Sequence, residues 1–259
     1  MTHKTVLFDL DDNVAVITLN RPDVGNAFDL TLSKELYGAA LECASNPEVR
    51  AVVITGAGKL FSGGGDLGFF NAQENIQKSL LEMTTYIHGA QSRFNRMNAP
   101  VIAAVNGTAG GGGFSLMCSC DLIIAADHAK FTMAYTAAGL TPDASSTYFL
   151  PRLIGHRRAA EMVLTNRRLT AAEAVDWGLI NQAVPAEELM PTVMKLAKQL
   201  AQGPTASYGK AMELIRKSFD NSLETQMEEE AQAISTFAGS DNVKEGIAAF
   251  SEKRKPNFK

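Results

Sequence analysis

Short apolar runs alternate with amphipathic stretches along the first two thirds of the chain. Runs of β-branched and other apolar residues predict buried strands over residues 6–10, 14–19, 51–55, 100–107 and 121–126. The polar residues Asp11, Asp12 and Asn13 separate the first two runs and predict a hairpin turn. Apolar residues at helical spacing predict helices over residues 30–43 and about 75–96. This pattern favours an α/β fold.

Helical patterns dominate from about residue 157 onward. They predict two short helices, followed by amphipathic helices over residues 189–200, 208–219 and 223–234. Gly203 and Pro204 break the chain between the first two amphipathic helices. Apolar stripes of this kind usually form a core or a subunit interface, so we do not expect them to bind a cofactor.

Composition excludes several classes of protein. The chain has 259 residues, of which 46% are hydrophobic and 20% charged, as in ordinary globular proteins. Its formal net charge of −4 argues against a nucleic-acid partner. There is no apolar signal-peptide core and no apolar run of membrane-spanning length. We therefore expect a protein that does not enter membranes. Three cysteines cannot form a disulfide framework, so we also expect it to be cytoplasmic.

Metal and thiol chemistry find no support in the spacing of histidines and cysteines. The four histidines show no HExxH pattern, and the pair Cys118 and Cys120 has no second cysteine pair. Both cysteines lie in the apolar stretch FSLMCSCDLIIAA, where they fit a buried core. We therefore predict no metal site and no cysteine nucleophile.

Two glycine clusters follow predicted strands, at residues 61–67 and 106–115. A phosphate-binding P-loop would need a glycine at Val53 and a Ser or Thr at Leu60. The spacing Gly63-x-Gly65-x-x-Gly68 matches the dinucleotide fingerprint, but it lies several residues beyond its strand. A serine-hydrolase elbow would need a glycine at position 117, where the chain has Met. None of these phosphate or hydrolase sites is predicted.

The glycines could instead place two backbone N–H groups beside a ligand. Glycine lets the backbone approach a ligand closely, and the second cluster precedes an apolar helix whose N-terminus carries partial positive charge. Two N–H groups that point at one carbonyl oxygen would form an oxyanion hole. The same glycines also fit tight packing between strand and helix, and the residues alone do not decide between these two hypotheses.

Four segments, in this order, are similar to the enoyl-CoA hydratase/isomerase (crotonase) superfamily: VITLNRPDVGNAF, AVVITGAGKLFSGGGDL, APVIAAVNGTAGGGGFSLMCSCDLIIAA and GLTPDASSTYFLPRLIG. The ending EGIAAFSEKRKPNF resembles the same family, so the similarity covers essentially the whole chain. It implies a crotonase-like spiral of ββα units over residues 1–200. It also implies a C-terminal helical oligomerisation region over residues 201–259 that builds a homotrimer or a dimer of trimers.

The resemblance further implies an acyl-CoA thioester substrate, with coenzyme A as part of the substrate and no other cofactor. The thioester carbonyl would lie between the backbone N–H groups of Gly65 and Gly112. Residues that match the family's coenzyme A contacts are Asn26, Ala27, Lys59, Gly63, Phe250 and Lys253. The last two match tail residues that reach the nucleotide of a neighbouring subunit.

Two positions depart from the family's hydratases. Those enzymes carry two glutamates, one that activates water and one that delivers the α-proton, where this chain has Ser115 and Tyr135. The acid/base pair for adding water is therefore missing. Asp143, in GLTPD, stands where family isomerases with this motif carry their acid/base. The resemblance thus implies an isomerase that moves a double bond, or isomerises a ring, through an enolate.

Other reactions within the superfamily stay open. The stretch KFTMAYTAAGLTPD resembles the ring-epoxide and Δ3,Δ2-enoyl-CoA isomerases of phenylacetate degradation. The 4-chlorobenzoyl-CoA dehalogenases pair a histidine at the position of His88 with an aspartate at that of Asp143, but they have tryptophan where Tyr135 stands. Hydratase activity and a non-catalytic acyl-CoA-binding subunit are further alternatives. Taken alone, Asp143 also fits a helix N-cap or turn, and His88 a structural residue.

Overall fold

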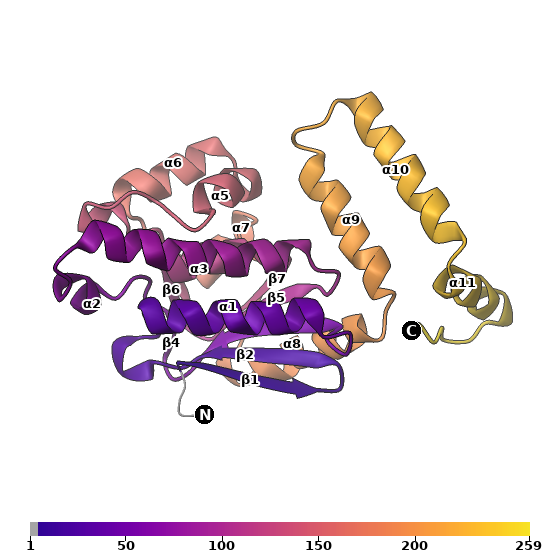
Figure 1. The fold of residues 1–259 in the computed structure, drawn as a ribbon, viewed down its shortest axis with the longest axis horizontal. Coiled ribbons are helices and arrows are strands. Elements are labelled where there is room, and N and C mark those ends of the chain that lie inside the picture. The colour runs from indigo at the N-terminus through magenta and orange to yellow at the C-terminus, as the bar shows by residue number, and fades with distance from the viewer. Residues whose placement is uncertain (1–4) are drawn as a thin grey trace.

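The structure, a computed structural model, describes residues 5–259 and contains two sheets (Figure 1). The larger sheet has the strand order β1-β2-β3-β5-β7-β10 and is parallel except for the antiparallel pair β1 and β2. Its strands are β1 (Val6–Asp11), β2 (Val14–Leu19), β3 (Ala51–Gly56), β5 (Val101–Val105), β7 (Leu122–Ala126) and β10 (Gln182–Val184). The smaller sheet has the order β4-β6-β8-β9. Its strands are β4 (Leu60–Ser62), β6 (Thr108–Gly110), β8 (Lys130–Thr132) and β9 (Leu169–Thr170).

From β3 to β8, successive strands of the chain are added alternately to the larger and the smaller sheet. A strand of the larger sheet is followed by a short strand of the smaller sheet and then by a helix: β3, β4 and α2; β5, β6 and α4; β7, β8 and α5. The helices of this part of the chain are α1 (Leu30–Ser45), α2 (Leu67–Asn71), α3 (Ile76–Arg96), α4 (Gly111–Cys118), α5 (Ser146–Ile154), α6 (His156–Thr165), α7 (Ala171–Asp176) and α8 (Leu189–Ala201). Each turn therefore places a new strand beside the previous one in both sheets, which is the ββα spiral that the sequence predicts.

Both faces of the larger sheet are covered, which explains its continuous apolar runs. Val52 and Ile54 of β3 belong to the core that α1 and α3 help to form, whereas Ala51 and Val53 belong to the core that packs against α8. Because successive side chains of a strand point to opposite faces, a strand buried on both sides must be apolar throughout. In Figure 1, α1 and α3 lie side by side across the body.

The predicted hairpin and the longer elements are confirmed. Asp12 and Asn13 both have positive φ, as a two-residue hairpin turn requires, and they connect β1 to β2. The predicted run over 100–107 is instead a five-residue strand, β5, followed by a separate short strand, β6. The short strands of the smaller sheet were not predicted, because two or three residues carry no measurable periodicity.

The helical tail consists of α9 (Thr205–Lys217), α10 (Leu223–Ala238) and α11 (Asp241–Glu252). Figure 1 shows α10 and α11 projecting away from the body at the right. The predicted stripe on α10 is not core in this chain, since Leu223, Met227 and Ile234 are exposed. Among residues 5–259, no helix is long and apolar enough to cross a membrane.

One ion pair fastens α9 to the body. The Arg216 guanidinium bonds to Asp121, which directly precedes β7, and to the backbone carbonyl of Asn95 at the end of α3. The other Asp121 oxygen accepts a hydrogen bond from the Val101 backbone N–H at 2.9 Å. Burial raises the pKa of Asp121, and Arg216 acts against this rise. The pair thus holds a tail helix against the edge of two strands.

We expect Arg216→Met to lower the free energy of unfolding by about 3 kcal/mol at neutral pH, because it leaves the Asp121 charge buried without a partner. A carboxyl whose pKa is higher in the folded than in the unfolded protein destabilises the fold at a pH above both pKa values, where it is ionised. This destabilisation disappears as the pH falls through the folded pKa and the carboxyl takes up a proton. The loss should therefore shrink in mild acid.

Urea unfolding at neutral and mildly acidic pH measures both effects. Lys210→Met is the matched control, since it removes an exposed α9 ion pair with Glu213 and should cost no more than about 1 kcal/mol at either pH. Equal losses in the two variants would contradict the assignment.

Candidate active site

The two glycine clusters meet where the short strands β4 and β6 end. These strands pair in parallel, so the residues that follow them leave the same edge of the smaller sheet. A β-carbon on Gly64 would lie 2.9 Å from the carbonyl oxygen of Gly110 and 3.2 Å from the backbone N of Gly112. Gly64 and Gly111 both have positive φ. Only glycine permits this combination of close approach and backbone conformation.

Two backbone N–H groups become available at this contact. Phe28 bonds through its N–H to the Gly64 carbonyl and through its carbonyl to the Asp66 N–H, which turns the intervening Gly65 N–H away from this pairing. Within residues 5–259 the Gly65 N–H has no hydrogen-bond partner. Gly112 is the second residue of α4, where helix N–H groups lack intrahelical partners. The arrangement fits a pair of donors to one oxygen.

Arg21 supports the first glycine loop. Its guanidinium bonds to Asp29 at 3.2 Å, to Asp66 at 2.9 Å and to the Ala27 carbonyl at 2.6 Å. The two aspartates also cap α1 and α2 by accepting backbone N–H bonds. Burial raises the pKa of Asp66, but the Phe69 backbone N–H and Arg21 outweigh it, so the net shift is downward. Arg21 therefore fixes the ends of two helices around the loop.

Asn26 supports the same loop from inside. It has positive φ and is fully buried. Its Nδ2 donates to the carbonyls of Ala57 and Leu60 at 2.8 and 2.7 Å, and its Oδ1 accepts from the Arg21 N–H at 2.9 Å. The Asn26 side chain thus ties its own loop, at Arg21, to the turn between β3 and β4.

A cavity of about 490 Å³ opens beside the glycine contact. Gly63, Gly65, Gly111 and Gly112 form one wall. Apolar side chains from α2, α3 and the loop after β8 form much of the remainder, and they include Leu67, Phe70, Leu80, Leu81, Met83, Ile87 and Leu140. Asp143 and Tyr135 also line the cavity. An apolar group attached to a carbonyl would therefore find both an oxygen-binding end and an apolar chamber.

Asp143 precedes a strained turn. Ala144 and Ser145 both have positive φ, which is rare for residues other than glycine. Hydrogen bonds maintain this conformation: the Asp143 carbonyl accepts from the Ser146 hydroxyl at 2.9 Å and from the Tyr135 hydroxyl at 3.3 Å. The Gln91 Nε2 donates to the Ala144 carbonyl at 2.9 Å. The backbone at Asp143 is therefore held from three sides.

His88 and Asp143 are brought together across the fold. The His88 Nε2 lies 2.9 Å from the Asp143 Oδ1, although 55 residues separate them in sequence. Their side chains are 51% and 38% exposed, so the pair lies at the border of the cavity and not in a dry interior. Within residues 5–259 the second carboxylate oxygen, Oδ2, has no protein partner. One oxygen is thus oriented by His88 while the other stays available.

The hydroxyl groups of Ser115 and Tyr135 form a hydrogen bond with each other. The Ser115 Oγ lies 2.8 Å from the Tyr135 hydroxyl and 3.2 Å from the Gly111 carbonyl, and Ser115 is completely buried. Burial raises the pKa of Tyr135 above its ordinary value, so the phenol stays protonated at neutral pH. The Tyr135 hydroxyl also lies about 4.0 Å from where a Gly112 β-carbon would be. This pair links the second glycine loop to Asp143 without supplying a carboxylate.

The remaining predicted residues lie apart from the cavity or at its edge. Lys59 is exposed on the loop before β4, and Ala27 is buried next to the Arg21 guanidinium. Phe250, which is 87% exposed, and Lys253 lie at the end of α11 in the projecting tail (Figure 1). The structure does not bring these two tail residues to the cavity of the same chain.

Within residues 5–259, no group of three or more His, Cys, Asp or Glu side chains is arranged to hold a metal ion. Burial raises the pKa of all three cysteine thiols, and that of Cys43 rises to about 12. A protonated, buried thiol is a poor nucleophile. The ionisable and polar groups at this place are the Asp143 and Tyr135 side chains that line the cavity, His88 beside Asp143, and the backbone groups of the glycine loops.

Comparison with known proteins accounts for this arrangement. The family model described as enoyl-CoA hydratase/isomerase matches residues 9–259. The chain belongs to the enoyl-CoA hydratase/isomerase family. A crystal structure of an enoyl-CoA hydratase subunit from Geobacillus kaustophilus superimposes with a TM-score of 0.91 at 36% identity and covers 99% of this chain and 98% of that one. The fold is therefore the crotonase fold, and the chain is an acyl-CoA enzyme of this family.

Similar proteins carry names for three different reactions. A probable enoyl-CoA hydratase from Rhodobacter capsulatus is 38% identical, covering 100% of this chain and 99% of the relative. A 4-chlorobenzoyl coenzyme A dehalogenase from Arthrobacter is 36% identical, covering 93% and 88%. The 1,2-epoxyphenylacetyl-CoA isomerase of Escherichia coli is 34% identical, covering 98% and 97%. Overall sequence identity thus shows the family, but it does not show which reaction the enzyme catalyses.

Sequence reasoning missed Gln91 and Arg21. Gln91 lies in the buried face of α3, between the core residues Ile87 and Phe94, and it is only 4% exposed. A glutamine at a core position of an amphipathic helix was the available signal, because a buried amide requires partners. Arg21 carried no comparable signal, since no periodicity of the chain relates it to its partners Asp29 and Asp66.

We expect Gly64→Ala to displace the Gly112 loop, because the new methyl group would meet the Gly110 carbonyl at 2.9 Å. Turnover of acyl-CoA thioesters should fall by more than about tenfold, as expected when an oxyanion donor is misplaced. The measurement is steady-state turnover together with denaturant unfolding.

Gly178→Ala is the matched control, because Gly178 also has positive φ but a β-carbon there would make only an ordinary contact at 3.9 Å. It should lower stability by about 1–2 kcal/mol through backbone strain and leave turnover intact. A Gly64→Ala enzyme with normal turnover would show that the loop contact does not position the donors.

Proposed function

We propose that this enzyme isomerises enoyl-CoA thioesters, with Asp143 as the acid and base and with Gly65 and Gly112 as the oxyanion donors. One observation supports it above the others: among the described residues that line the cavity, Asp143 is the one carboxylate. A double-bond shift needs one group that removes and returns one proton, and addition of water needs a base and an acid together. The number of carboxylates thus favours the isomerase.

The proposed reaction moves one proton. The Asp143 Oδ2 removes a proton from the carbon next to the thioester, and the electron pair of that C–H bond moves into an enolate. The Gly65 and Gly112 N–H groups stabilise the negative charge on the thioester oxygen. Asp143 then returns its proton to the γ-carbon, and the double bond comes to lie next to the carbonyl. A ring substrate would follow the same enolate chemistry.

Ser115 and Tyr135 support this proposal because neither side chain carries a carboxylate. Their hydroxyl groups bond to each other at 2.8 Å, and neither side chain is ionised at neutral pH. Neither can accept a proton from water as a glutamate would. The Tyr135 hydroxyl is instead placed between Gly112 and the Asp143 carbonyl, where it maintains the distance between them.

Binding of coenzyme A is also part of the proposal. We propose that Gly63 contributes to the thioester end through backbone contacts and that exposed Lys59 contacts the phosphates. The exposed apolar residues of α9, α10 and α11 suit packing against further copies of the chain in a homotrimer or dimer of trimers. Phe250 and Lys253 would then serve a neighbouring subunit's nucleotide.

Asp143→Asn is expected to lower kcat for the shift of a Δ3 to a Δ2 double bond by about 10²–10⁴-fold, because the amide cannot carry the proton. Binding of the thioester should persist, since the oxyanion donors are unchanged. Turnover in D₂O followed by mass spectrometry measures deuterium uptake and, separately, the mass gain that water addition would cause.

Asp127→Asn is the matched control, because Asp127 is an exposed aspartate that also has a histidine beside it, at 3.6 Å. It should isomerise at the normal rate. The proposal is wrong if Asp143→Asn matches the parent enzyme, or if the parent enzyme adds water in preference to moving the double bond.

Hydrolytic substitution on an aryl-CoA is a second candidate, and the 2.9 Å contact between His88 and Asp143 favours it. The Asp143 Oδ2 would attack the ring carbon that bears a halide, the halide would leave, and an aryl ester of Asp143 would form. Water, losing a proton to His88, would then attack the carboxyl carbon of that ester. The products would be a hydroxyaryl-CoA and a regenerated carboxylate that contains one oxygen from water.

A single turnover of 4-chlorobenzoyl-CoA in H₂¹⁸O, with enzyme in excess, tests this candidate. The product of the first turnover should contain unlabelled oxygen from Asp143, while the enzyme gains the label. His88→Gln should accumulate the ester as a covalent mass increase. No chloride release, or a product labelled in the first turnover, rules out this route.

A further inference from the structure

The cavity of about 490 Å³ beside the glycine contact, which we call the substrate cavity, extends along one face of α3. The residues of this face recur at helical spacing: Gln77, Leu80, Leu81, Met83, Thr84 and Ile87. Because a helix rises about 1.5 Å per residue, the face is about 15 Å long. His88 follows Ile87, and its Nε2 lies 2.9 Å from the Asp143 Oδ1, so the Ile87 end of the face lies beside the proposed acid and base.

This face of α3 is buried near Asp143 and opens to solvent toward the start of the helix. Ile87 and Met83 are only 3% and 4% exposed, whereas Leu81 is 73% exposed. A leucine that lines a cavity and also keeps most of its surface exposed offers apolar surface that a ligand can cover. The apolar face therefore continues from Asp143 to an open end at Leu81.

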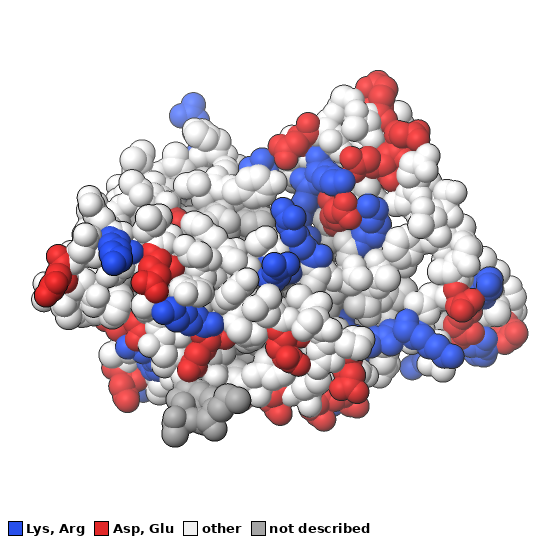
Figure 2. Space-filling view, viewed as in Figure 1, with Lys and Arg blue, Asp and Glu red and all other residues white. Residues whose placement is uncertain are grey.

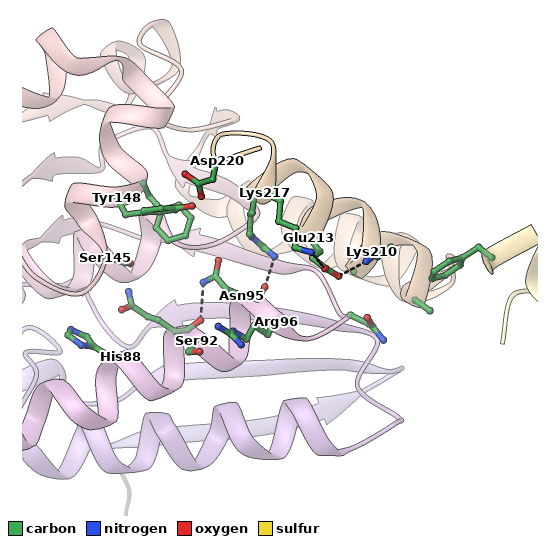
Figure 3. Close-up of a pocket in the computed structure, with 17 residues that line it drawn as sticks. His88, Ser92, Asn95, Arg96, Ser145, Tyr148, Lys210, Glu213, Lys217 and Asp220 are labelled. Atoms are coloured by element: carbon green, nitrogen blue, oxygen red, sulfur yellow. Dashed lines mark hydrogen bonds and ion pairs between the residues drawn. The ribbon is translucent and has the colours of Figure 1, made fainter. Parts of the chain in front are cut away.

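A second cavity, which His88 helps to line, does not suit an apolar chain. Its volume is about 970 Å³, and α3, the start of α5 and α9 enclose it (Figure 3). Figure 2 shows Lys and Arg gathered between the body and the tail helices, with acidic residues among them. The charged residues that line this cavity are Arg96, Lys210, Glu213, Arg216, Lys217 and Asp220. Within residues 5–259 Arg96 has no ion-pair partner, so an apolar chain in this cavity would cover an unpaired charge, which is unfavourable.

We propose that the substrate cavity takes a linear acyl chain of medium length whose last carbons pack against Leu81. This inference rests on the proposed isomerase function, which requires the α- and γ-carbons to lie at Asp143, next to Ile87. From Ile87 to Leu81 the helix advances about 9 Å. An extended carbon chain, like an extended polypeptide, advances about 1.2 Å per bond, so about seven carbons beyond the γ-carbon reach Leu81. The cavity therefore fits an acyl chain of about ten to twelve carbons.

The lining favours this chain over a ring or a charged acyl group. A benzoyl or phenylacetyl group ends within about one helical turn of Ile87 and would leave Leu81 exposed. Among the described residues that line the substrate cavity, Asp143 is the one charged side chain, so none would pair with a second carboxylate on the substrate. The Thr84 hydroxyl, midway between Ile87 and Leu81, already donates to the Leu81 carbonyl at 2.9 Å and needs no polar partner from the substrate. The face is therefore suited to burying methylene groups.

The affinity of saturated acyl-CoA thioesters reports chain length without any turnover. In isothermal titration calorimetry, we expect Kd to fall about three- to fourfold for each methylene added from hexanoyl- to decanoyl-CoA, because each CH₂ group is buried. The fall should end near dodecanoyl-CoA, where further carbons pass Leu81 into solvent. Phenylacetyl-CoA should bind at least about tenfold more weakly than decanoyl-CoA. Affinity that does not rise with chain length, or phenylacetyl-CoA that binds as tightly as decanoyl-CoA, would overturn the inference.

Thr84→Trp places a large side chain between Ile87 and Leu81 and should shorten the chain that fits. Decanoyl-CoA should bind at least about tenfold more weakly than it does to the parent enzyme, while butyryl-CoA should bind within about twofold. Thr85→Trp is the matched control, because Thr85 also donates to the Leu81 carbonyl, at 3.0 Å, but is exposed and lines neither cavity. It should keep the parent series. Equal affinities in the two variants would show that the chain does not pass Thr84.

Leu81→Ser tests the open end of the cavity and leaves the reacting end in place. Dodecanoyl-CoA should bind about fivefold more weakly than it does to the parent enzyme, and hexanoyl-CoA should bind unchanged. Leu164→Ser should bind both thioesters as the parent does, because Leu164 is 77% exposed on α6 and lines neither cavity. If Leu81→Ser instead lowers the mass of the assembly in sedimentation and leaves both affinities unchanged, a second copy of the chain covers Leu81 and the inference is wrong.

The outcomes separate the inference from the function on which it rests, because saturated thioesters bind without reacting. If Asp143→Asn isomerises a Δ3-decenoyl-CoA as fast as the parent enzyme does, the proposed function fails, and the medium-chain substrate assignment fails with it. If Asp143→Asn loses this activity but the parent's affinity does not rise with chain length, the reaction stands and the medium-chain assignment alone is wrong.

Discussion

The site depends on a contact between two backbones that leaves no room for a side chain. A β-carbon on Gly113 would lie 2.4 Å from the β-carbon of Ser62, and one on Gly107 would lie 2.0 Å from the Lys59 carbonyl oxygen. Real β-carbons essentially never lie within 3.0 Å of an atom to which they are not bonded. The parallel pairing of β4 with β6 sets this approach, and the glycines permit it. The pair of donors that we propose, the N–H groups of Gly65 and Gly112, depends on this approach.

Buried polar groups then stabilise loops that have little apolar surface of their own. Arg21 joins two helix caps, and Asn26 joins its own loop to the turn between β3 and β4. Gln91 performs the same task for the turn after Asp143, where two consecutive residues have positive φ. Hydrogen bonds suit this purpose because they are directional, whereas apolar packing fixes volume more than orientation. The loops of the site are therefore held by polar side chains, although the cavity itself is lined largely by apolar ones.

The sequence predicted the strands and helices that obey a simple period. The strand β3 and the helix α1 are of this kind. For the glycine clusters, the residues alone left an oxyanion hole and tight packing both open, and the pairing of Gly65 with Gly112 came from the family resemblance. The sequence could not predict the contact of His88 with Asp143 from spacing, since that contact depends on how α3 crosses the start of α5. The short strands of the smaller sheet and the exposure of α10 depend in the same way on tertiary arrangement, which periodicity does not report.

The division between backbone and side chains explains why relatives of similar identity carry different reactions in their names. The oxyanion donors that we propose are backbone groups, so a change of side chain elsewhere does not remove them. The side chains that we propose to decide the reaction come from separate elements: Ser115 from α4, Tyr135 from the segment after β8, and Asp143 from the segment before α5. They are nevertheless coupled, because Ser115 bonds to Tyr135 and Tyr135 bonds to the Asp143 carbonyl. In this chain a buried hydroxyl pair stands where the family resemblance implies two glutamates, and one carboxylate bonded to a histidine lies beside the cavity. That set suits the movement of one proton, because addition of water needs a second ionisable group within reach of the double bond.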